Sequence, residues 1–265
     1  MEEAMSTSFV KGVATDLTCY RYSETGWVRA KVHAPLEREL TVYVNLQHLV
    51  TILCTPTKLN YLVLGFLYSE RIISNISDVM MMRVCDAEAE VDVRLRDAEF
   101  QLPTKRTLTS GCGGGATFTT QGQVVNSELV VTPAEVLSQM KLLLEKEELY
   151  HLSGGVHTSA LSDSTKLLIV TEDIGRHNTL DKIQGESLMR KISTKDRLIL
   201  TTGRVSSEML RKAARMQVPV VASRHTPTGT AMSMAKDLGI ALIGQARGNR
   251  LSVYSHPERL GCPTQ

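Results

Sequence analysis

Hydrophobic and polar residues alternate over much of 27–93, which is the pattern of strands with one buried face. Apolar residues occupy every second position over 40–44, and Asn45 separates them from a second apolar run at 49–54. The two runs predict an antiparallel hairpin. A further strand is expected at 91–95, so this region should be rich in β-structure.

A helical pattern follows the hairpin. Thr55 with Pro56 predicts a helix start, since threonine caps helices and proline suits their first position. The apolar residues of one helical face are Leu59, Leu62, Val63, Phe66 and Leu67. Gly65 in mid-helix costs up to about 1 kcal/mol relative to alanine, so we expect close packing against a neighbouring element there.

From residue 132 the pattern changes to short apolar runs separated by amphipathic segments. Thr132 and Glu135 fit a capping box around Pro133 and predict a helix. The expected strands are then 166–170, 198–200, 218–222 and 240–243, and the expected helices are 176–189, 206–216 and 231–238. Strands with little polar alternation, separated by helices, indicate a largely parallel sheet covered on both faces.

Composition and charge are those of a globular protein. The 265 residues are 42% hydrophobic and 22% charged, with a net charge of +2, which excludes disordered and collagen-like chains and gives no reason to expect nucleic-acid binding. No segment resembles a signal peptide or a membrane span, so we expect a cytoplasmic protein without a membrane partner. We expect a β-rich region with one helix over residues 1–130 and an α/β domain over residues 131–265.

Cys112 lies among four glycines in the segment 110–115. Glycine has no Cβ to restrict the backbone, so we expect a mobile loop, at about 102–123, that presents one thiol for chemistry. The alternative is a turn that holds a small hydrophobic residue. The five cysteines show no metal-like pairing, so we expect free thiols and no metal site.

Charged and small residues gather where the predicted strands end. They are Glu172, Asp173, Gly175, Arg176, His177, Asp181, Lys182, Gly203, Arg204, Ser206 and Arg250, together with Arg224 and His225 after a third strand and Arg247 near the C-terminus. Ligands of open α/β sheets bind beyond the carboxyl ends of strands, and helix starts with arginine bind phosphate. We therefore expect a pocket for a polyanion that also needs carboxylate partners, such as the amidine edge of a guanine. The alternative is a set of solvated helix starts.

His157 follows the pair Gly154 and Gly155. A histidine in such a place is either a satisfied structural group or an acid, base or ligand contact. In the second case it would have to reach Cys112 or the bound anion.

In the order of its motifs the chain resembles the FdhD/NarQ family of formate dehydrogenase accessory sulfurtransferases. The matching segments are 65–70, 110–113, 154–157, 172–177 with 180–182, 203–209 and 250–257. The resemblance spans most of the chain from about residue 35 and implies a cytidine deaminase-like three-layer α/β/α sheet domain with a smaller N-terminal β-rich subdomain. Deaminase chemistry is not implied, because no Pro-Cys-x-x-Cys follows His256 and Glu258 to complete a zinc site.

The resemblance implies a sulfur relay. Members of the family accept persulfide sulfur from a cysteine desulfurase and pass it to the molybdenum cofactor, as bis-molybdopterin guanine dinucleotide, before a formate dehydrogenase receives it. Cys112 would carry the sulfur, while His157 and the strand-end residues named above would bind the cofactor as a substrate. Gly115 stands where the family commonly has a second cysteine, so the loop of this chain cannot close a local disulfide. The sequence leaves open whether the chain forms a homodimer.

Two other functions are open from the residues. A cofactor chaperone would hold the guanine dinucleotide in the same pocket without sulfur chemistry. A cysteine hydrolase would pair Cys112 with His157 or His177, but a glycine-rich loop does not hold a nucleophile against its base.

Overall fold

In this computed structural model the chain is described at residues 12–85, 89–101, 107–108, 116–117 and 122–262. Cys112 and most of the predicted loop at about 102–123 lie outside these ranges, so the mobility expected of that loop stays a prediction.

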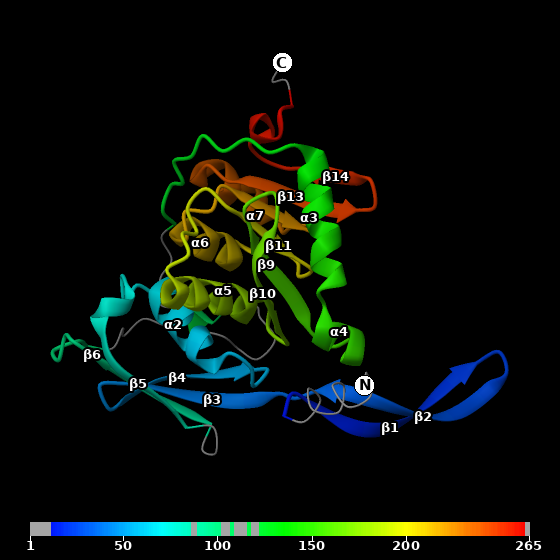
Figure 1. The fold of residues 1–265 in the computed structure, drawn as a ribbon, viewed down its shortest axis with the longest axis horizontal. Coiled ribbons are helices and arrows are strands. Elements are labelled where there is room, and N and C mark those ends of the chain that lie inside the picture. The colour runs from blue at the N-terminus through cyan, green and yellow to red at the C-terminus, as the bar shows by residue number, and fades with distance from the viewer. Residues whose placement is uncertain (1–11, 86–88, 102–106, 109–115, 118–121, 263–265) are drawn as a thin grey trace.

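The N-terminal part consists of strands and one long helix (Figure 1). Its elements are β1 (Ala14–Ser23), β2 (Gly26–Pro35), β3 (Arg38–Val44), β4 (Gln47–Cys54), α2 (Leu59–Ser69), η1 (Ile76–Asp78), β5 (Val79–Cys85), β6 (Glu90–Leu95), β7 (Thr107–Leu108) and β8 (Ala116–Thr117). β1 and β2 form a two-stranded arm that projects from the body, and a four-stranded sheet has the order β4-β3-β6-β5. The predicted hairpin is confirmed, since β3 and β4 pair antiparallel.

Helix α2 begins later than the sequence predicts. Its N-cap is Lys58, in the left-handed conformation with φ 52°, so the prediction of a cap at Thr55 is wrong. Thr55 is fully buried instead, because its N–H donates to Asp173 and its hydroxyl accepts the N–H of Ile174, both at 3.1 Å. These long-range bonds take the groups that a local cap would use.

Helix α2 crosses α5 (Arg176–Arg190) at backbone contact. A Cβ at Gly65 would lie 1.8 Å from the carbonyl oxygen of Asp181, and a Cβ at Gly185 would lie 1.9 Å from that of Tyr61. No side chain fits at such distances, so each helix approaches the other through a glycine. The close packing predicted for Gly65 is confirmed, and it joins the N-terminal sheet to the rest of the chain.

The C-terminal part is one layered sheet. Its elements are α3 (Pro133–Glu145), α4 (Glu148–Ser153), β9 (His157–Ser162), β10 (Leu167–Asp173), α5, β11 (Leu198–Thr201), α6 (Ser207–Arg215), β12 (Val220–Ser223), α7 (Gly229–Leu238), β13 (Ala241–Arg247), β14 (Arg250–Val253) and η2 (Pro257–Leu260). The six strands have the order β10-β9-β11-β12-β13-β14. The capping box of Thr132 and Glu135 that starts α3 is present as predicted.

The sheet is mixed, so the prediction of a largely parallel sheet is wrong. β12 is parallel to β11 and β13, whereas β9 is antiparallel to β10 and β11, and β14 is antiparallel to β13. The pattern of apolar residues missed β9, which is buried although several of its residues are polar. Their hydroxyls are satisfied inside the fold: Ser159 bonds to Thr179 at 2.7 Å and to Thr201 at 2.9 Å.

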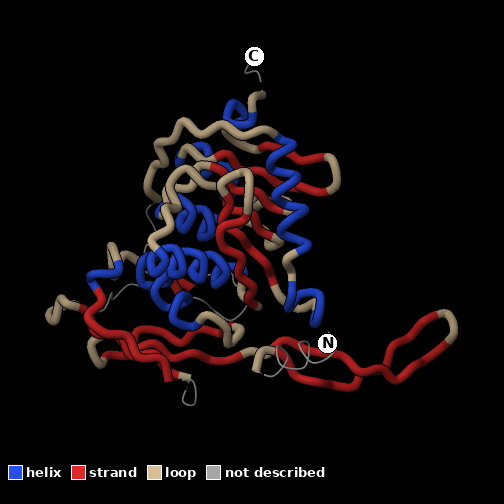
Figure 2. Tube along the Cα trace, in the orientation of Figure 1, coloured by secondary structure: helices blue, strands red, loops and turns tan. Residues whose placement is uncertain are grey.

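Helices cover both faces of this sheet (Figure 2). Helix α3 packs on one face over Leu200, Val220 and their neighbours, and α5, α6 and α7 pack on the other over Ile199, Val221 and theirs. Alternate residues of each strand thus face opposite layers. The predicted α/β class, with N-terminal sheets and a helix-packed larger sheet, is confirmed at this level. Val125 lies in the core beneath α7, and the boundary predicted near residue 130 stays a prediction.

Among the described residues, no helix is both long enough and apolar enough to cross a membrane.

Candidate functional site

Two cavities that share one lining residue lie along one edge of the six-stranded sheet, and we treat them as the small and large parts of one groove. β11, β12 and β13 end at this edge, and the antiparallel strands β9 and β14 begin there. A small part of the groove, about 240 Å³, is lined by Glu147, Tyr150, Gly154, Gly155, Val156, His157, Thr202, Arg224 and His225. A large part, about 480 Å³, is lined by His225, Thr226, Gln245, Arg247, Arg250 and Ser252. His225 belongs to both parts, and we call the whole the strand-end groove.

The strand-end groove is strongly cationic. Arg224, Arg247 and Arg250 line it, and Arg247 is held in place because its Nε donates to the carbonyl oxygen of Arg224 at 2.8 Å. Partial burial and then the charges of Arg247, Arg224 and Arg204 lower the pKa of His225. A diphosphate in this groove would meet several guanidinium groups, each able to bond two oxygens.

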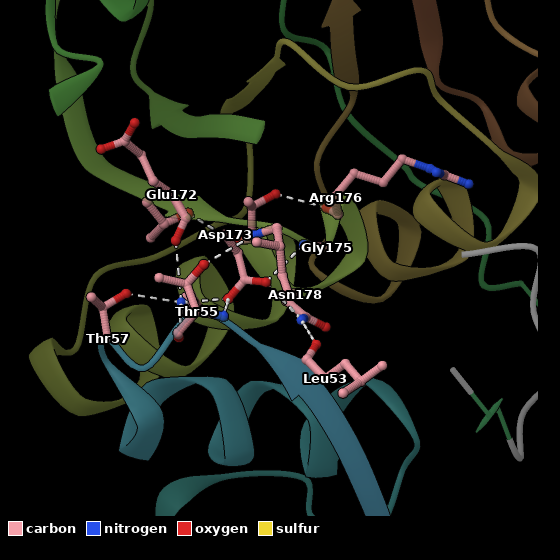
Figure 3. Close-up of polar contacts among 12 residues, drawn as sticks. Leu53, Thr55, Thr57, Glu172, Asp173, Gly175, Arg176 and Asn178 are labelled. Atoms are coloured by element: carbon pink, nitrogen blue, oxygen red, sulfur yellow. Dashed lines mark hydrogen bonds and ion pairs between the residues drawn. The ribbon is translucent and has the colours of Figure 1, made fainter. Parts of the chain in front are cut away.

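His157, Gly203 and Arg176 meet beside the small part of the groove. A Cβ at Gly203 would lie 2.9 Å from the Cβ of Arg176 and 3.5 Å from Nδ1 of His157, so glycine makes room for both side chains. The Arg176 side chain extends away from the polar cluster around Asp173 (Figure 3). Burial, with the charges of Arg176 and His225, lowers the pKa of His157, so its ring is neutral at neutral pH and one nitrogen can accept a hydrogen bond.

Lys182 lies in a buried network instead of the groove. Its Nζ is 2.6 Å from Asp173 Oδ2, and both side chains are fully buried. Lys182 also donates, at 3.0–3.2 Å, to the carbonyl oxygens of Thr55 and Glu172 and to the hydroxyl of Thr57. All three Nζ protons therefore have acceptors inside the protein.

Asp173 completes the same network from the other side of the ion pair (Figure 3). Its oxygens accept the N–H of Thr55 at 3.1 Å, the N–H of Gly175 at 2.8 Å and the side-chain amide of Asn178 at 2.8 Å. Asn178 in turn donates to the carbonyl oxygen of Leu53 at 2.8 Å. These bonds join the turn before α5 to the end of β4.

Glu172 holds the short helix α4 beside the groove. Its carboxylate accepts the N–H groups of Glu148, Leu149 and Tyr150 at 3.1, 2.8 and 2.9 Å. Those three donors have no partner within the first turn of α4, so Glu172 satisfies them from β10. The carboxylate thereby places Tyr150 at the groove.

Asp181 and His177 lie on α5 in two further polar contacts. Asp181 pairs with Lys212 at 2.6 Å and accepts the hydroxyl of Ser69 at 2.9 Å; burial raises the pKa of Asp181 to about 6. His177 Nε2 lies 3.0 Å from the hydroxyl of Ser206, the N-cap of α6. Burial, then the charges of Lys212 and Arg176, lowers the pKa of His177 to about 2, so the ring is neutral.

The structure therefore divides the predicted site residues into two groups. His157 and Arg250 line the groove, and Gly203 and Arg176 flank it; Arg204 is exposed and close enough to shift the pKa of His225. The buried contacts around α5 hold Glu172, Asp173, Gly175, His177, Asp181, Lys182 and Ser206. Ligand binding by either group stays a prediction. Cys112 lies outside the described residues.

Two lining residues of the groove, Glu147 and Tyr150, were not predicted from the sequence. Arg224, His225 and Arg247 come at or just after the ends of β12 and β13, where the sequence pattern placed them. Glu147 and Tyr150 carry no local signal, because the contact that brings α4 to the groove comes from Glu172. The described residues contain no group of three or more His, Cys, Asp or Glu side chains placed to hold a metal ion.

The chain is similar to known proteins over nearly its whole length. The profile of the FdhD/NarQ family matches residues 35–261. A protein named Sulfur carrier protein FdhD from Bacillus licheniformis is 37% identical over 258 residues, which cover 94% of this chain and 98% of that protein. One of the same name from Staphylococcus aureus is 36% identical over 232 residues, covering 84% and 88%.

A crystal structure supports the same relationship. It is that of a candidate formate dehydrogenase accessory protein from Desulfotalea psychrophila, with a TM-score of 0.76 and 23% identity, covering 94% of this chain and 99% of that one. This likeness shows a shared fold. Together with the family match, it confirms the resemblance predicted from the motifs: the chain belongs to the FdhD/NarQ family.

Proposed function

We propose that this protein is a sulfur carrier that takes persulfide sulfur from a cysteine desulfurase and transfers it to bis-molybdopterin guanine dinucleotide for the activation of a formate dehydrogenase. The observation that carries the proposal is 37% identity, over 94% of the chain, to a protein named Sulfur carrier protein FdhD. The arginine-lined strand-end groove supports it, because the cofactor is a substrate with diphosphate groups.

In this proposal Cys112 carries the sulfur. Its thiolate attacks the outer sulfur of the persulfide on the desulfurase, the sulfur–sulfur bond of that persulfide breaks, and the desulfurase thiolate leaves. A persulfide forms on Cys112 with no net change in oxidation state. The support is the sequence context: the neighbours of Cys112 are glycines, which have no side chain to cover a thiol.

Release of the sulfur as sulfide needs two electrons. A second thiol supplies them when its thiolate attacks the inner sulfur of the persulfide, expels sulfide and forms a disulfide with Cys112. Gly115 provides no such thiol, and Cys54 is buried, with burial raising the pKa of its thiol to about 12. In this proposal the second thiol comes from another molecule, which leaves a mixed disulfide on Cys112.

The cofactor is held in the strand-end groove in this proposal. Arg224, Arg247 and Arg250 contact its phosphates, with Arg204 and His157 at the rim. The buried contacts of Asp173, Lys182 and their neighbours position the turn before α5 rather than touch the ligand. We also propose that the sheet and its helices form a cytidine deaminase-like three-layer domain beginning near residue 131, supported by the separate cores on the two faces of the sheet.

A cofactor chaperone without sulfur transfer is the second candidate. The observation that favours it is the groove itself, whose lining among the described residues includes arginines but no cysteine. A protein with this groove could hold and protect the guanine dinucleotide with no thiol chemistry.

Mass spectrometry after incubation with a cysteine desulfurase and cysteine separates the two. We expect a persulfide on Cys112 of the full-length protein and of the control variant Cys262→Ser, which changes an exposed thiol elsewhere. Cys112→Ser should take up no sulfur there and should leave the dehydrogenase inactive in cells that lack the native gene. A Cys112→Ser protein that activates the dehydrogenase as well as wild type would overturn the relay in favour of the chaperone.

A further inference from the structure

The arm formed by β1 and β2 exposes apolar side chains on both of its faces. Tyr20, Tyr22 and Trp27 are 69%, 70% and 71% exposed. They share one face, because Tyr22 pairs with Trp27 and Tyr20 lies two positions before Tyr22, whereas Leu17 and Val28 are exposed on the opposite face. Neither strand has a further neighbour among the described residues, and a two-stranded ribbon alone is marginally stable in water. Its exposed faces therefore mark an interaction surface.

The base of the arm is fixed to the body of the molecule. Ala14 is buried in a cluster with Leu149 of α4 and Val156. The N–H of Leu36 donates to the carbonyl oxygen of Val13 at 2.8 Å, which holds the two strands together where they leave the body. The arm thus projects in a defined direction, and this lowers the entropy that a partner loses by ordering it.

The same base adjoins the wall of the strand-end groove. Val156 lines the small part of the groove. Beside it, a Cβ at Gly155 would lie 2.9 Å from Cγ of Pro35, the last residue of β2. A protein that holds the arm is therefore brought next to the groove, where the proposed function places the cofactor. The dehydrogenase is the partner that must receive that ligand.

The charge of the arm indicates what kind of surface it fits. The outer half, residues 20–31, carries the cations Arg21, Arg29 and Lys31 and one acid, Glu24, all of them exposed. Tyrosine, tryptophan and arginine are the residues that most often dominate the binding energy of protein interfaces. An acidic protein surface complements this combination of aromatic rings and positive charge.

A second copy of the chain and a membrane match the arm less well. The chain has a net charge of +2 and arginines line its strand-end groove, so a second copy offers the arm no acidic cleft there. A bilayer has no donors or acceptors for the unpaired backbone groups along the edges of the ribbon, whereas a protein cleft can supply them.

We propose that the arm docks into an acidic cleft of the cofactor-free formate dehydrogenase and so brings the dehydrogenase to the strand-end groove. Tyr22 and Trp27 are the apolar anchors, and Arg29 and Lys31 face carboxylates of the cleft. The inference rests on the proposed function for the identity of the partner, and it adds the surface that recognises this partner.

Biolayer interferometry between the full-length protein and the purified cofactor-free dehydrogenase tests the docking. Trp27→Ala should weaken binding about 10- to 100-fold, the range expected for an aromatic anchor. Arg29→Glu should also weaken it and should reduce the dependence of the affinity on salt. The matched controls are Leu46→Ala, an exposed apolar residue in the turn after β3, and Lys141→Glu, an exposed charge on α3; both should bind as wild type does.

Sulfur uptake separates the docking from the function on which it rests. After incubation with a cysteine desulfurase and cysteine, Trp27→Ala and Arg29→Glu should form the persulfide on Cys112 as wild type does, while their activation of the dehydrogenase in cells falls. Wild type that does not bind the dehydrogenase, or arm variants that bind it as tightly as wild type, would overturn the docking and leave sulfur transfer intact. A wild type without persulfide on Cys112, whose arm variants still lose the dehydrogenase, would overturn sulfur transfer and keep the docking.

Two further measurements test the other occupants. If wild type is a dimer in sedimentation velocity and Trp27→Ala is a monomer with unchanged binding of the dehydrogenase, a second copy covers the arm and the docking is overturned. Arm-dependent binding to vesicles of phosphatidylcholine and phosphatidylglycerol, again with unchanged binding of the dehydrogenase, would overturn it in favour of a membrane.

Discussion

Two kinds of charged side chain lie near the ends of the sheet strands, and burial separates their roles. Lys182 and Asp173 are fully buried and satisfied by each other and by the backbone. Arg204 and Arg250 are exposed at the edge where the strands end. The first pair holds the turn in place, whereas the second kind is free to meet a ligand.

We predict that Arg204→Ala and Arg250→Ala each weaken the binding of guanosine diphosphate by one to two decades, because each removes a charge-assisted contact worth about 1.5–3 kcal/mol. Titration calorimetry measures the loss. Arg29→Ala, on the exposed arm, is the control and should bind as wild type does. Equal affinities in all four proteins would contradict the placement of the phosphates.

Thiol reactivity provides a second prediction at this scale. Iodoacetamide labelling followed by peptide mass spectrometry should show Cys262, which is exposed, labelled quickly and Cys54 labelled only on unfolding. Burial raises the pKa of Cys54 to about 12, so its thiolate is scarce as well as covered. Cys112 should react as quickly as Cys262 if it is presented on a mobile loop. Labelling of Cys112 as slow as that of Cys54 would contradict the prediction of a mobile loop.

At the scale of single residues, the sequence shows which side chains gather at strand ends but not which of them face solvent. Arg176 and His177 are neighbours in one motif, yet the first flanks the groove and the second lies against Ser206. That difference depends on how α5 rotates against α6, and α5 is fixed by long-range contacts to 53–57 that no local pattern contains.

At the scale of elements, the crossing of α2 and α5 is the contact with least tolerance. Gly65→Ala would place a Cβ 1.8 Å from the carbonyl oxygen of Asp181, so the helices must move apart. We expect the free energy of unfolding to fall by about 1–3 kcal/mol or more, measured by urea denaturation with circular dichroism.

Gly229→Ala is the matched control for that measurement. Gly229 is the first residue of α7 and nothing lies within 4 Å of a Cβ built there, so alanine should leave stability unchanged or raise it by up to about 1 kcal/mol. Similar midpoints for Gly65→Ala and wild type would show that the crossing is looser than the described distance.

The elements themselves could largely be predicted where their pattern is local. The capping box starts α3 as expected, and the apolar spacing found α2 but misplaced its first turn. β9 could not be predicted in this way, because its buried hydroxyl groups are satisfied by hydrogen-bond partners on α5 and β11, which are distant in the sequence. Because β9 was not predicted, its antiparallel pairing with β10 and β11 was not predicted either.

For the molecule as a whole, His177 makes stability depend on pH. The folded protein keeps the ring neutral because its pKa is lowered to about 2, while the unfolded chain takes up a proton below its usual value of about 6.5. The contribution of His177 to stability is therefore complete above about pH 6.5 and falls by up to about 1.4 kcal/mol for each pH unit below it, while the raised pKa of Asp181 acts in the opposite direction.

Urea midpoints at about pH 7.5 and about pH 5.5 measure this effect. We expect wild type to be less stable at the lower pH and His177→Gln to lose less stability between the two. A variant whose midpoint shifts as much as that of wild type would show that other groups cause the pH dependence.

The projecting arm carries the tryptophan, so tryptophan fluorescence of this protein reports on the arm. Trp27 is the one tryptophan of the chain; it lies near the tip of the arm with 71% of the residue exposed, against the ring of Tyr22. Its emission in the native state should thus already resemble that of free tryptophan in water, and global unfolding should change it little. A blue-shifted emission that returns to the red on dilution would mean that another surface, such as a second copy of the chain, covers the arm.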